Sequence, residues 1–169
     1  MTEFPVDEKM FAWRALMELH ASVVDALERH LQDGGVGVPL AWYEVLLRLS
    51  HAADASMRMQ DLADVLLLSR SGVTRLADRL ESAGFIERRV CETDRRGTLA
   101  VITNAGREAL DRCNPLVVEA LDEHFSRHLT KTDAHALMSI LQHVLDAERR
   151  AHDEAASQVG ASDRRELVR

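Results

Sequence analysis

The chain has 169 residues, a formal net charge of −7, 46% hydrophobic residues and only 4% aromatic residues. This length corresponds to one domain, or one domain with appended helices, whose core must consist mainly of Leu, Val and Ala. No apolar run approaches the roughly 20 residues that cross a bilayer, and no apolar signal core follows Met1. Cys91 and Cys113 form no CxxC motif, which argues against a disulfide framework or a cysteine zinc site. We therefore expect a soluble protein of the reducing cytoplasm.

The charge is distributed unevenly along the chain. Residues 57–97 contain eight Arg and seven acidic residues, so this stretch carries +1 and the remainder carries −8. A phosphate backbone responds to the local field of a protein surface rather than to its net charge. The acidic balance of the whole chain therefore does not exclude nucleic acid as a partner of this stretch.

Two helices are predicted before this stretch. Apolar residues recur at spacings of four from Phe11 to Leu31, which predicts a helix over residues 6–32 that ends at the glycines after Asp33. Its single apolar stripe requires a partner to cover it. Pro39 suits the first turn of a second helix that ends near Ala53. Residues 56–59 predict a very short strand.

The central stretch predicts two short helices and a β-hairpin. The helices cover residues 61–67 and about 69–83, with Ser69 as the N-cap of the second. Their spacing divides the side chains into a buried set (Leu62, Val65, Val73, Leu76, Leu80) and an outward set (Arg70, Ser71, Thr74, Arg75, Asp78, Arg79). Residues 85–90 and 98–102 have strand character and flank a polar tip that ends in Gly97, which predicts the hairpin.

The C-terminal part predicts two further helices. Thr103 caps a helix from Asn104 to about Leu129, and Pro115 inside it predicts a kink or a break. Thr130 and Asp133 have the spacing of a capping box and begin the last helix. Its apolar stripe fades after Arg149, so residues 151–169 are expected to be a frayed helix or disordered.

Together these elements predict a mostly α fold with a small β-hairpin, a winged helix-turn-helix with long N- and C-terminal dimerisation helices. The second short helix can enter the major groove of DNA, and the arginines of the hairpin tip can enter the minor groove. For the helix alone, an ordinary charged surface helix is an open alternative. The succession of helix, turn, helix, strand, basic tip and strand favours binding to a double-stranded DNA operator.

At this point the sequence resembles a known family. The segments LLLSRSGVTRLADRLE (residues 66–81), AGFIERR (83–89), DRRG (94–97) and LAVITNAG (99–106) resemble the MarR family of transcriptional regulators. The resemblance implies a homodimer that binds a pseudo-palindromic operator and is released, as a repressor, by a small aromatic or phenolic ligand. It implies a single domain over residues 1–150, with a DNA-binding lobe at about 55–103 and dimerisation helices at about 6–32 and 104–150.

The resemblance also assigns roles to individual residues. The implied DNA contacts lie on the second short helix and the wing: Ser69, Arg70, Ser71, Thr74, Arg75, Arg79, Arg95 and Arg96. Asp94 is expected to orient a wing arginine through a charge-assisted bond. Arg88 and Arg89 are candidates for phosphate contact or for a ligand pocket, and a solvated strand residue is the alternative for Arg88.

The small-molecule effector is less defined. The chain also resembles the members that respond to urate or related aromatic anions, which implies a ligand site with Trp13, Asp64, Arg89 and a wing arginine. In the alternative interpretation Trp13 packs at the dimer interface, Asp64 is exposed, and the ligand occupies an apolar pocket between the dimerisation helices and the DNA-binding lobe.

Other activities have weaker sequence support. His124 and His128 have the spacing of one helix face, but no accompanying set of ligands from the first two helices is apparent. We therefore assign no metal and no cofactor, and a metal-responsive regulator of the same fold stays an alternative. Cys91 lies near arginines, which leaves a redox-responsive regulator as an alternative. A winged-helix interaction module without DNA binding is another. The chain has no phosphate-binding glycine loop, nucleophile elbow or HExxH motif, so we expect no enzyme.

Overall fold

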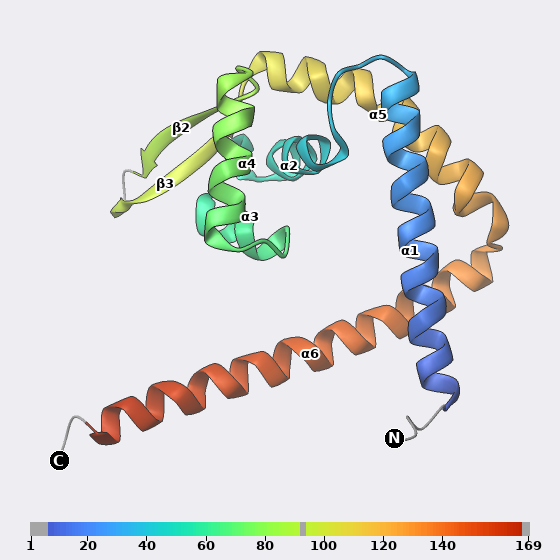
Figure 1. The fold of residues 1–169 in the computed structure, drawn as a ribbon. Coiled ribbons are helices and arrows are strands. Elements are labelled where there is room, and N and C mark those ends of the chain that lie inside the picture. The colour runs from blue at the N-terminus through green and yellow to red at the C-terminus, as the bar shows by residue number, and fades with distance from the viewer. Residues whose placement is uncertain (1–6, 92–93, 167–169) are drawn as a thin grey trace, which may run out of the picture. The chain divides into compact units, whose positions relative to one another are not determined.

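The structure is a computed structural model (Figure 1) that describes the backbone of residues 7–91 and 94–166 and the side chains of residues 7–91 and 97–151. The chain forms two compact units, Met1–Phe125 and Ser126–Arg169. In the described part of the chain, no helix combines the length and the apolar character that a membrane span requires.

Helix α1 (Glu8–Asp33) begins at Asp7, whose side chain accepts a hydrogen bond from the Lys9 amide. Its C-terminal half is packed into the unit through three buried side chains: Ala26, Leu27 and Leu31. Its N-terminal half instead exposes large apolar side chains to solvent: Met10, Phe11, Trp13, Met17 and Leu19. Among the described residues of the first unit, the stripe predicted to need a partner is therefore buried at its C-terminal end and exposed at its N-terminal end.

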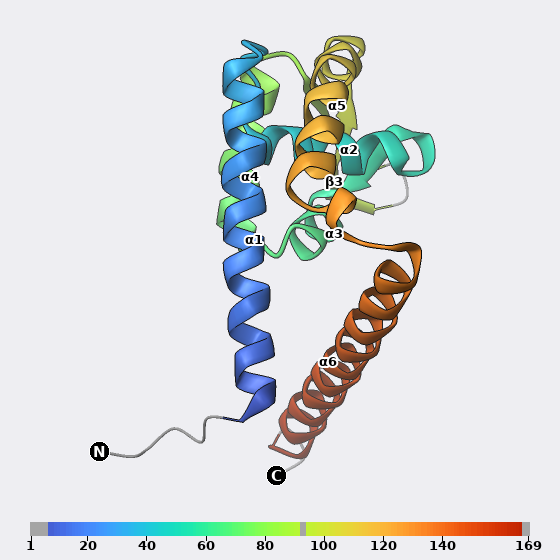
Figure 2. The same ribbon diagram turned by 90° about the vertical axis from the view of Figure 1, so that its right-hand side faces the viewer.

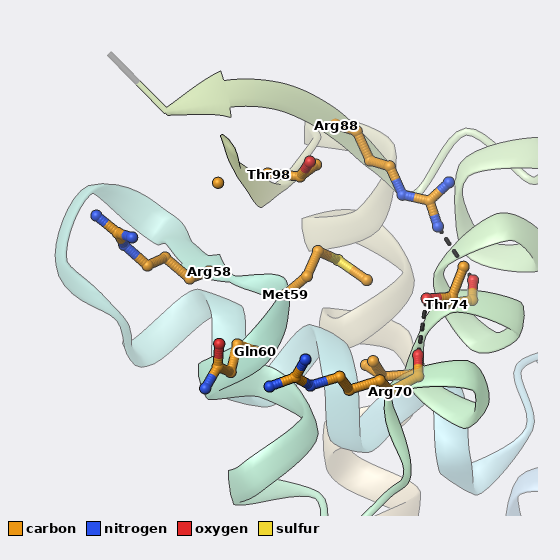
Figure 3. Close-up of a pocket in the computed structure, with 9 residues that line it drawn as sticks. Arg58, Met59, Gln60, Arg70, Thr74, Arg88 and Thr98 are labelled. Carbon is orange, nitrogen blue, oxygen red and sulfur yellow. Dashed lines mark hydrogen bonds between the residues drawn. The ribbon is translucent and has the colours of Figure 1, made fainter. Parts of the chain in front are cut away.

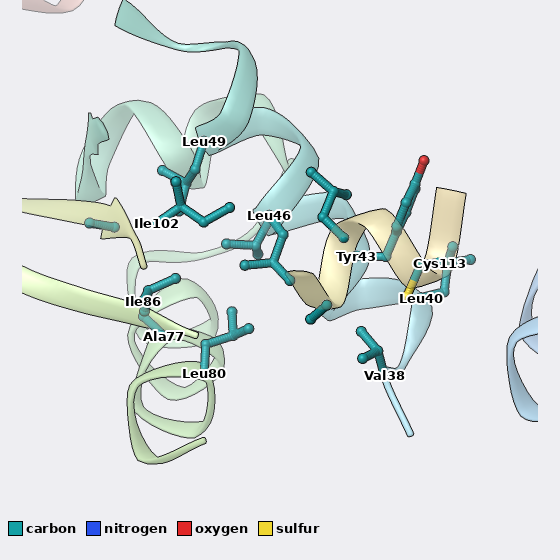
Figure 4. Close-up of a cluster of buried hydrophobic side chains, with 14 of the residues drawn as sticks. Val38, Leu40, Tyr43, Leu46, Leu49, Ala77, Leu80, Ile86, Ile102 and Cys113 are labelled. Carbon is teal, nitrogen blue, oxygen red and sulfur yellow. The ribbon is translucent and has the colours of Figure 1, made fainter. Parts of the chain in front are cut away.

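Helix α2 (Leu40–His51) is the centre of the core, because Leu46 and Leu49 have no exposed surface. Side chains from α2, from α4 (Arg70–Ser82) and from the sheet meet there, as Figure 4 shows. After a 3-10 turn (Ala53–Ala55) the chain enters strand β1 (Ser56–Arg58), which confirms the short predicted strand.

The sheet has the strand order β1-β3-β2, and both pairs are antiparallel. Strand β2 (Ile86–Cys91) pairs with β3 (Asp94–Ile102) from Ile86↔Ile102 to Val90↔Thr98, followed by an irregularity and the pair Cys91↔Asp94. Strand β1 contacts only the base of β3, at residues 99–101. The outer part of the hairpin therefore consists of two strands, as a wing does.

Helix α3 (Met59–Val65) ends two residues earlier than predicted, because Leu67 adopts the left-handed conformation with a φ of 53°. This turn changes one member of the predicted buried set. Val65 is the last residue of α3 and is 43% exposed, so its prediction as a core residue was wrong, whereas Leu62 has no exposed surface.

Helix α5 (Asn104–His124) begins at Thr103, whose hydroxyl accepts a hydrogen bond from the Gly106 amide at 3.0 Å. The helix continues through Pro115 and ends at His124, not near Leu129 as predicted. The Phe125 backbone is not helical, and residues 126–128 form a separate 3-10 turn. The next helix begins at Lys131 with Thr130 as its N-cap, so the chain must leave the helical conformation between His124 and Thr130. His124 and His128 therefore do not share one helix face.

The second unit contains helix α6 (Lys131–Glu166). Its predicted capping box is confirmed: the Thr130 amide donates to Asp133 Oδ2 at 2.9 Å, and the Asp133 amide donates to Thr130 Oγ1 at 3.2 Å. Hydrogen bonds that the Thr130 hydroxyl and the Thr130 amide donate to the Asp133 carboxylate hold the pKa of this carboxyl below its usual value. The helix exposes a set of apolar side chains: Met138, Ile140, Val144 and Leu145. It also continues past Arg149, where the predicted stripe fades.

Candidate nucleic-acid interface

Helix α4 presents a basic face because its opposite face is anchored in the core. Val73, Ala77 and Leu80 are buried. All six residues predicted to face outward are exposed: Arg70, Ser71, Thr74, Arg75, Asp78 and Arg79. The division of α4 into a buried and an outward face is therefore confirmed.

The hydroxyl groups at the start of α4 already have partners. Ser69 Oγ caps the helix by accepting a hydrogen bond from the Gly72 amide at 3.1 Å, and it lies 3.1 Å from Ser71 Oγ. Thr74 Oγ1 donates to the Arg70 carbonyl oxygen at 2.7 Å. Because the Thr74 hydroxyl donates its proton to the Arg70 carbonyl oxygen, it can serve solvent or a ligand mainly as a hydrogen-bond acceptor. Ser69 has a structural role as the helix cap that is independent of DNA.

Unlike these hydroxyl groups, the arginine side chains of α4 have no partner among the described residues. Among the described residues, no acidic side chain forms an ion pair with Arg70, Arg75 or Arg79. Their guanidinium groups therefore retain all their donors for phosphate oxygens or for guanine edges, which arginine recognises by two parallel hydrogen bonds.

Arg88 of β2 is not a solvated strand residue. Its Nη1 lies 2.6 Å from Asp78 Oδ1 and 3.2 Å from Glu81 Oε2, and its Nη2 donates to the Thr74 carbonyl oxygen at 3.0 Å. The side chain is only 25% exposed. Arg88 thus joins the wing to α4, a role that the sequence analysis missed. The signal was present in the acids at positions 78 and 81 on the flank of α4.

A pocket of about 620 Å³ lies between α4 and the sheet (Figure 3). It is lined by residues of β1, α3, α4 and the wing: Arg58, Met59, Gln60, Arg70, Val73, Thr74, Arg88, Gly97 and Thr98. Three of these are arginines, and Arg70 and Thr74 also belong to the predicted DNA-contacting face. An anion in this pocket would therefore lie beside the predicted DNA-contacting face.

The three sequence-predicted ligand residues do not line this pocket. Trp13 is 54% exposed on α1, Asp64 is exposed on α3, and Arg89 is exposed and forms an ion pair with Glu87. In the described part of the chain, the structure does not bring these side chains together with the pocket.

The wing tip falls partly outside the described residues. The backbone of Asp94, Arg95 and Arg96 forms the start of β3, but their side chains lie outside the described part, so their predicted roles stay predictions. Cys91 next to them is only 7% exposed. Cys113 is fully buried, and burial raises the pKa of its thiol. Burial of both thiols disfavours a redox-responsive regulator.

Comparison with known proteins places this geometry in context. Residues 36–97 match the model of the MarR family. The crystal structure of AbsC, a MarR family transcriptional regulator from Streptomyces coelicolor, superposes with a TM-score of 0.79 at 32% identity, over 88% of this chain and 99% of that chain. The chain belongs to the MarR family. Its members are DNA-binding transcriptional regulators rather than enzymes, as the sequence predicted.

Two further proteins are similar to this chain over most of its length. Sco3205, a MarR family regulator from Streptomyces coelicolor solved in complex with DNA, has a TM-score of 0.77 and 29% identity over 87% of this chain and 91% of that chain. The transcriptional repressor MprA of Escherichia coli K12 is 29% identical over 85% of this chain and 79% of its own length. The mostly helical winged fold is thus confirmed along most of the chain.

Proposed function

We propose that this MarR family member is a homodimeric repressor that binds a pseudo-palindromic operator and is released by a small aromatic or phenolic ligand. The observation that carries the proposal is the basic outward face of α4, where Arg70, Arg75 and Arg79 have no acidic partner among the described residues. The similarity to a transcriptional repressor, MprA, supports the direction of regulation.

The exposed apolar side chains support a dimer. One lobe reads one half-site, and two lobes at a fixed spacing are needed for a palindromic operator. Phe11 and Trp13 on α1, and Ile140 and Val144 on α6, are more than half exposed in the single chain. Full burial of an exposed apolar side chain contributes about 1.5–3 kcal/mol, so each of these half-exposed side chains favours association by roughly half of that. We assign α1, α5 and α6 to dimerisation and residues 55–103 to DNA binding.

In this proposal α4 lies in the major groove and the wing contacts the adjacent minor groove. Arg75 and Arg79 contact base edges or phosphates, Ser71 and Thr74 add hydroxyl contacts, and Arg70 lies at the N-terminal end of the helix. Arg95 and Arg96 contact the minor groove, and Asp94 orients one of them. Ser69 serves mainly as the cap that sets the direction of α4.

The pocket between α4 and the sheet is the proposed effector site. Its arginines suit a carboxylate or phenolate, and Met59 and Val73 offer apolar surface to a ring. A ligand that contacts Arg70 and Thr74 removes them from the DNA-contacting face. Release follows because the ligand binds the DNA-free conformation better than the bound one. The set Trp13, Asp64 and Arg89 is the competing proposal for the site.

The DNA part is tested by enriching genomic fragments on the purified dimer and measuring affinity for the selected operator. We expect Arg75→Ala to cost about 1–3 kcal/mol and to relax discrimination at one base pair. Replacing both Arg95 and Arg96 by Ala should weaken binding to all sequences and flatten the salt dependence. Arg149→Ala/Arg150→Ala on α6 removes the same charge and is the matched control. Equal losses in all three variants would contradict the assignment.

The effector part is tested with benzoate and phenol as probes of operator release. Arg58 lines the pocket but is not among the predicted DNA contacts, so Arg58→Gln should weaken the response to benzoate while the operator affinity is retained. The control is Arg48→Gln, which removes an exposed arginine of α2. Loss of the response in Trp13→Phe, with Arg58→Gln unaffected, would move the site to the competing set.

A further inference from the structure

Helix α1 lies alongside α5 (Figures 1 and 2). Three metal-ligating side chains of these two helices come together. His30 is in the last turn of α1, and Glu123 and His124 end α5. One ligand atom of each residue lies within 4.8 Å of the ligand atoms of the other two. The His30 and His124 ring centroids are 5.7 Å apart with an interplanar angle of 81°.

The imidazole of His30 is already oriented for coordination. Its Nδ1 lies 2.9 Å from the Ala26 carbonyl oxygen, which can only accept a hydrogen bond, so Nδ1 carries the proton. The second nitrogen, Nε2, therefore has its lone pair on the side of Glu123, whose Oε2 lies 3.7 Å away. A backbone carbonyl that holds the other ring nitrogen is the usual support of a metal-bound histidine.

We propose that His30, Glu123 and His124 bind a divalent transition-metal ion, with zinc as the best match. Two imidazoles and one carboxylate form a three-ligand set that leaves a fourth position for water, and nitrogen ligands disfavour calcium and magnesium. In a tetrahedral site the ligand atoms lie about 3.4 Å apart, given metal–ligand distances near 2.1 Å. Rotation of the half-exposed Glu123 and of the partly buried His124 side chain closes the remaining distance.

This site differs from the pair His124 and His128 that the sequence analysis considered as metal ligands. His128 is not available to the helix face of His124, because α5 ends at His124. The ligand that the sequence left unidentified on the first helix is His30, which lies 94 positions away from His124 along the chain. Only the packing of α1 against α5 brings the two together.

A bound ion would connect the last turns of two helices. Leu116 of α5 packs against Gly34 just beyond the end of α1, so the two helices are already in close contact one step away from the cluster. A bound ion would add a second link, between His30 and the last residues of α5, directly before the chain leaves the first unit at Phe125. Metal binding to the folded state alone therefore stabilises it by mass action.

The test is zinc binding to the full-length protein after removal of metal with EDTA and dialysis, measured in competition with a chromophoric chelator. We expect one zinc ion per chain at this site, and at least about a hundredfold loss of affinity in His30→Gln and in His124→Gln. Glu123→Gln, at a half-exposed position, is the variant least disruptive to folding. His51→Gln, an exposed histidine at the end of α2, is the matched control and should bind zinc as the wild type does.

A second measurement is the thermal unfolding midpoint. Zinc in excess should raise the midpoint of the wild type and of His51→Gln, and should leave His30→Gln and His124→Gln unchanged. Circular dichroism without metal establishes that each variant is folded. The proposal is overturned if the wild type binds zinc no more tightly than the double variant His30→Gln/His124→Gln. The proposal is also overturned if the zinc affinity falls in only one of the two single histidine variants, since the site would then not link α1 to α5.

Discussion

The guanidinium of Arg88 on the wing and the carboxylate of Asp78 on α4 are 2.6 Å apart, which is the distance of a strong charge-assisted hydrogen bond. Glu81 and the Thr74 carbonyl oxygen accept further hydrogen bonds from the same guanidinium. One side chain thus sets the position of the hairpin relative to the helix proposed to read DNA. In the proposed complex both elements contact the same duplex, so we expect their relative position to affect operator binding.

Replacing Arg88 should therefore affect both stability and DNA binding. Arg88→Lys keeps the charge but cannot reach two carboxylates and a carbonyl with a planar fork. We expect the free energy of unfolding to fall by about 1–2 kcal/mol in urea denaturation. Operator affinity, measured under conditions where the variant is fully folded, should fall as well. The neighbouring variant Arg89→Lys is the control, because Arg89 is mostly exposed and should change stability by less than about 0.5 kcal/mol.

Substitutions of Ser69 separate its role as a cap from a role in DNA contact. Ser69→Ala removes the acceptor of the Gly72 amide and should destabilise the protein by about 1 kcal/mol. Ser69→Asp keeps a good N-cap and should retain stability, but its negative charge beside phosphates should weaken operator binding. Thermal unfolding and operator titration measure the two effects. Operator affinity in Ser69→Asp equal to that of the wild type would place Ser69 away from the DNA.

Gly106 is required by the packing of α5 against Phe85, the residue that precedes β2. A Cβ at this position would overlap the Phe85 carbonyl oxygen, which is backbone and cannot move aside alone. We expect Gly106→Ala to destabilise the protein by at least about 2 kcal/mol, despite the better helix propensity of alanine. Gly72→Ala makes the same change in α4, where the nearest atom is Ser69 Oγ at 3.2 Å, and should shift stability by less than about 1 kcal/mol. Chemical denaturation of both variants makes the comparison.

The buried thiol of Cys113 predicts a dependence on alkaline pH. Burial raises the pKa of this thiol, and it also raises the pKa of Tyr43, whose side chain lies in the same core. Both groups stay protonated in the folded state at pH values where the unfolded chain releases these protons. The free energy of unfolding should therefore be unaffected by them at neutral pH and should decrease as the pH rises above about 8.

Thiol reactivity tests the burial of Cys113 on which this prediction rests. In Cys91→Ser the remaining thiol, Cys113, should react with an aromatic disulfide reagent many times more slowly in the folded protein than in urea. Replacing Cys113 by Ala should flatten part of the loss of stability between about pH 8 and pH 10. A folded-state reaction as fast as that of the unfolded chain would show that the thiol is accessible.

Local signals predicted the elements of this fold well. The Ser69, Thr103 and Thr130 caps all accept the expected backbone hydrogen bonds, because a cap depends on residues within one helical turn. The buried face of α4 follows from spacing for the same reason. Where two local signals competed, the boundaries were wrong, as at Leu129, where the capping box at Thr130 requires α5 to end earlier.

Contacts between distant segments were not predictable in this way. The exposure of Val65 depends on the left-handed Leu67, a conformation that leucine rarely adopts and that no sequence signal announces. The ion pair of Arg88 requires knowledge of how the wing leans on α4. The approach of His30 to His124 requires the packing of two helices more than 90 residues apart, which spacing within either helix does not contain.

Because β1 is shorter than β2 and β3, the wing is supported by a third strand only at its base. Its base is held on both sides, by β1 at residues 99–101 and by Arg88 on the side of β2, whereas the segment beyond them pairs on one edge only. A two-stranded ribbon twists more readily than a sheet of three strands. In the proposed DNA complex we therefore expect the two-stranded part of the hairpin to adapt to minor grooves of different width while its base keeps its angle to α4, so that operators with different flanks are bound through the same contacts in the major groove.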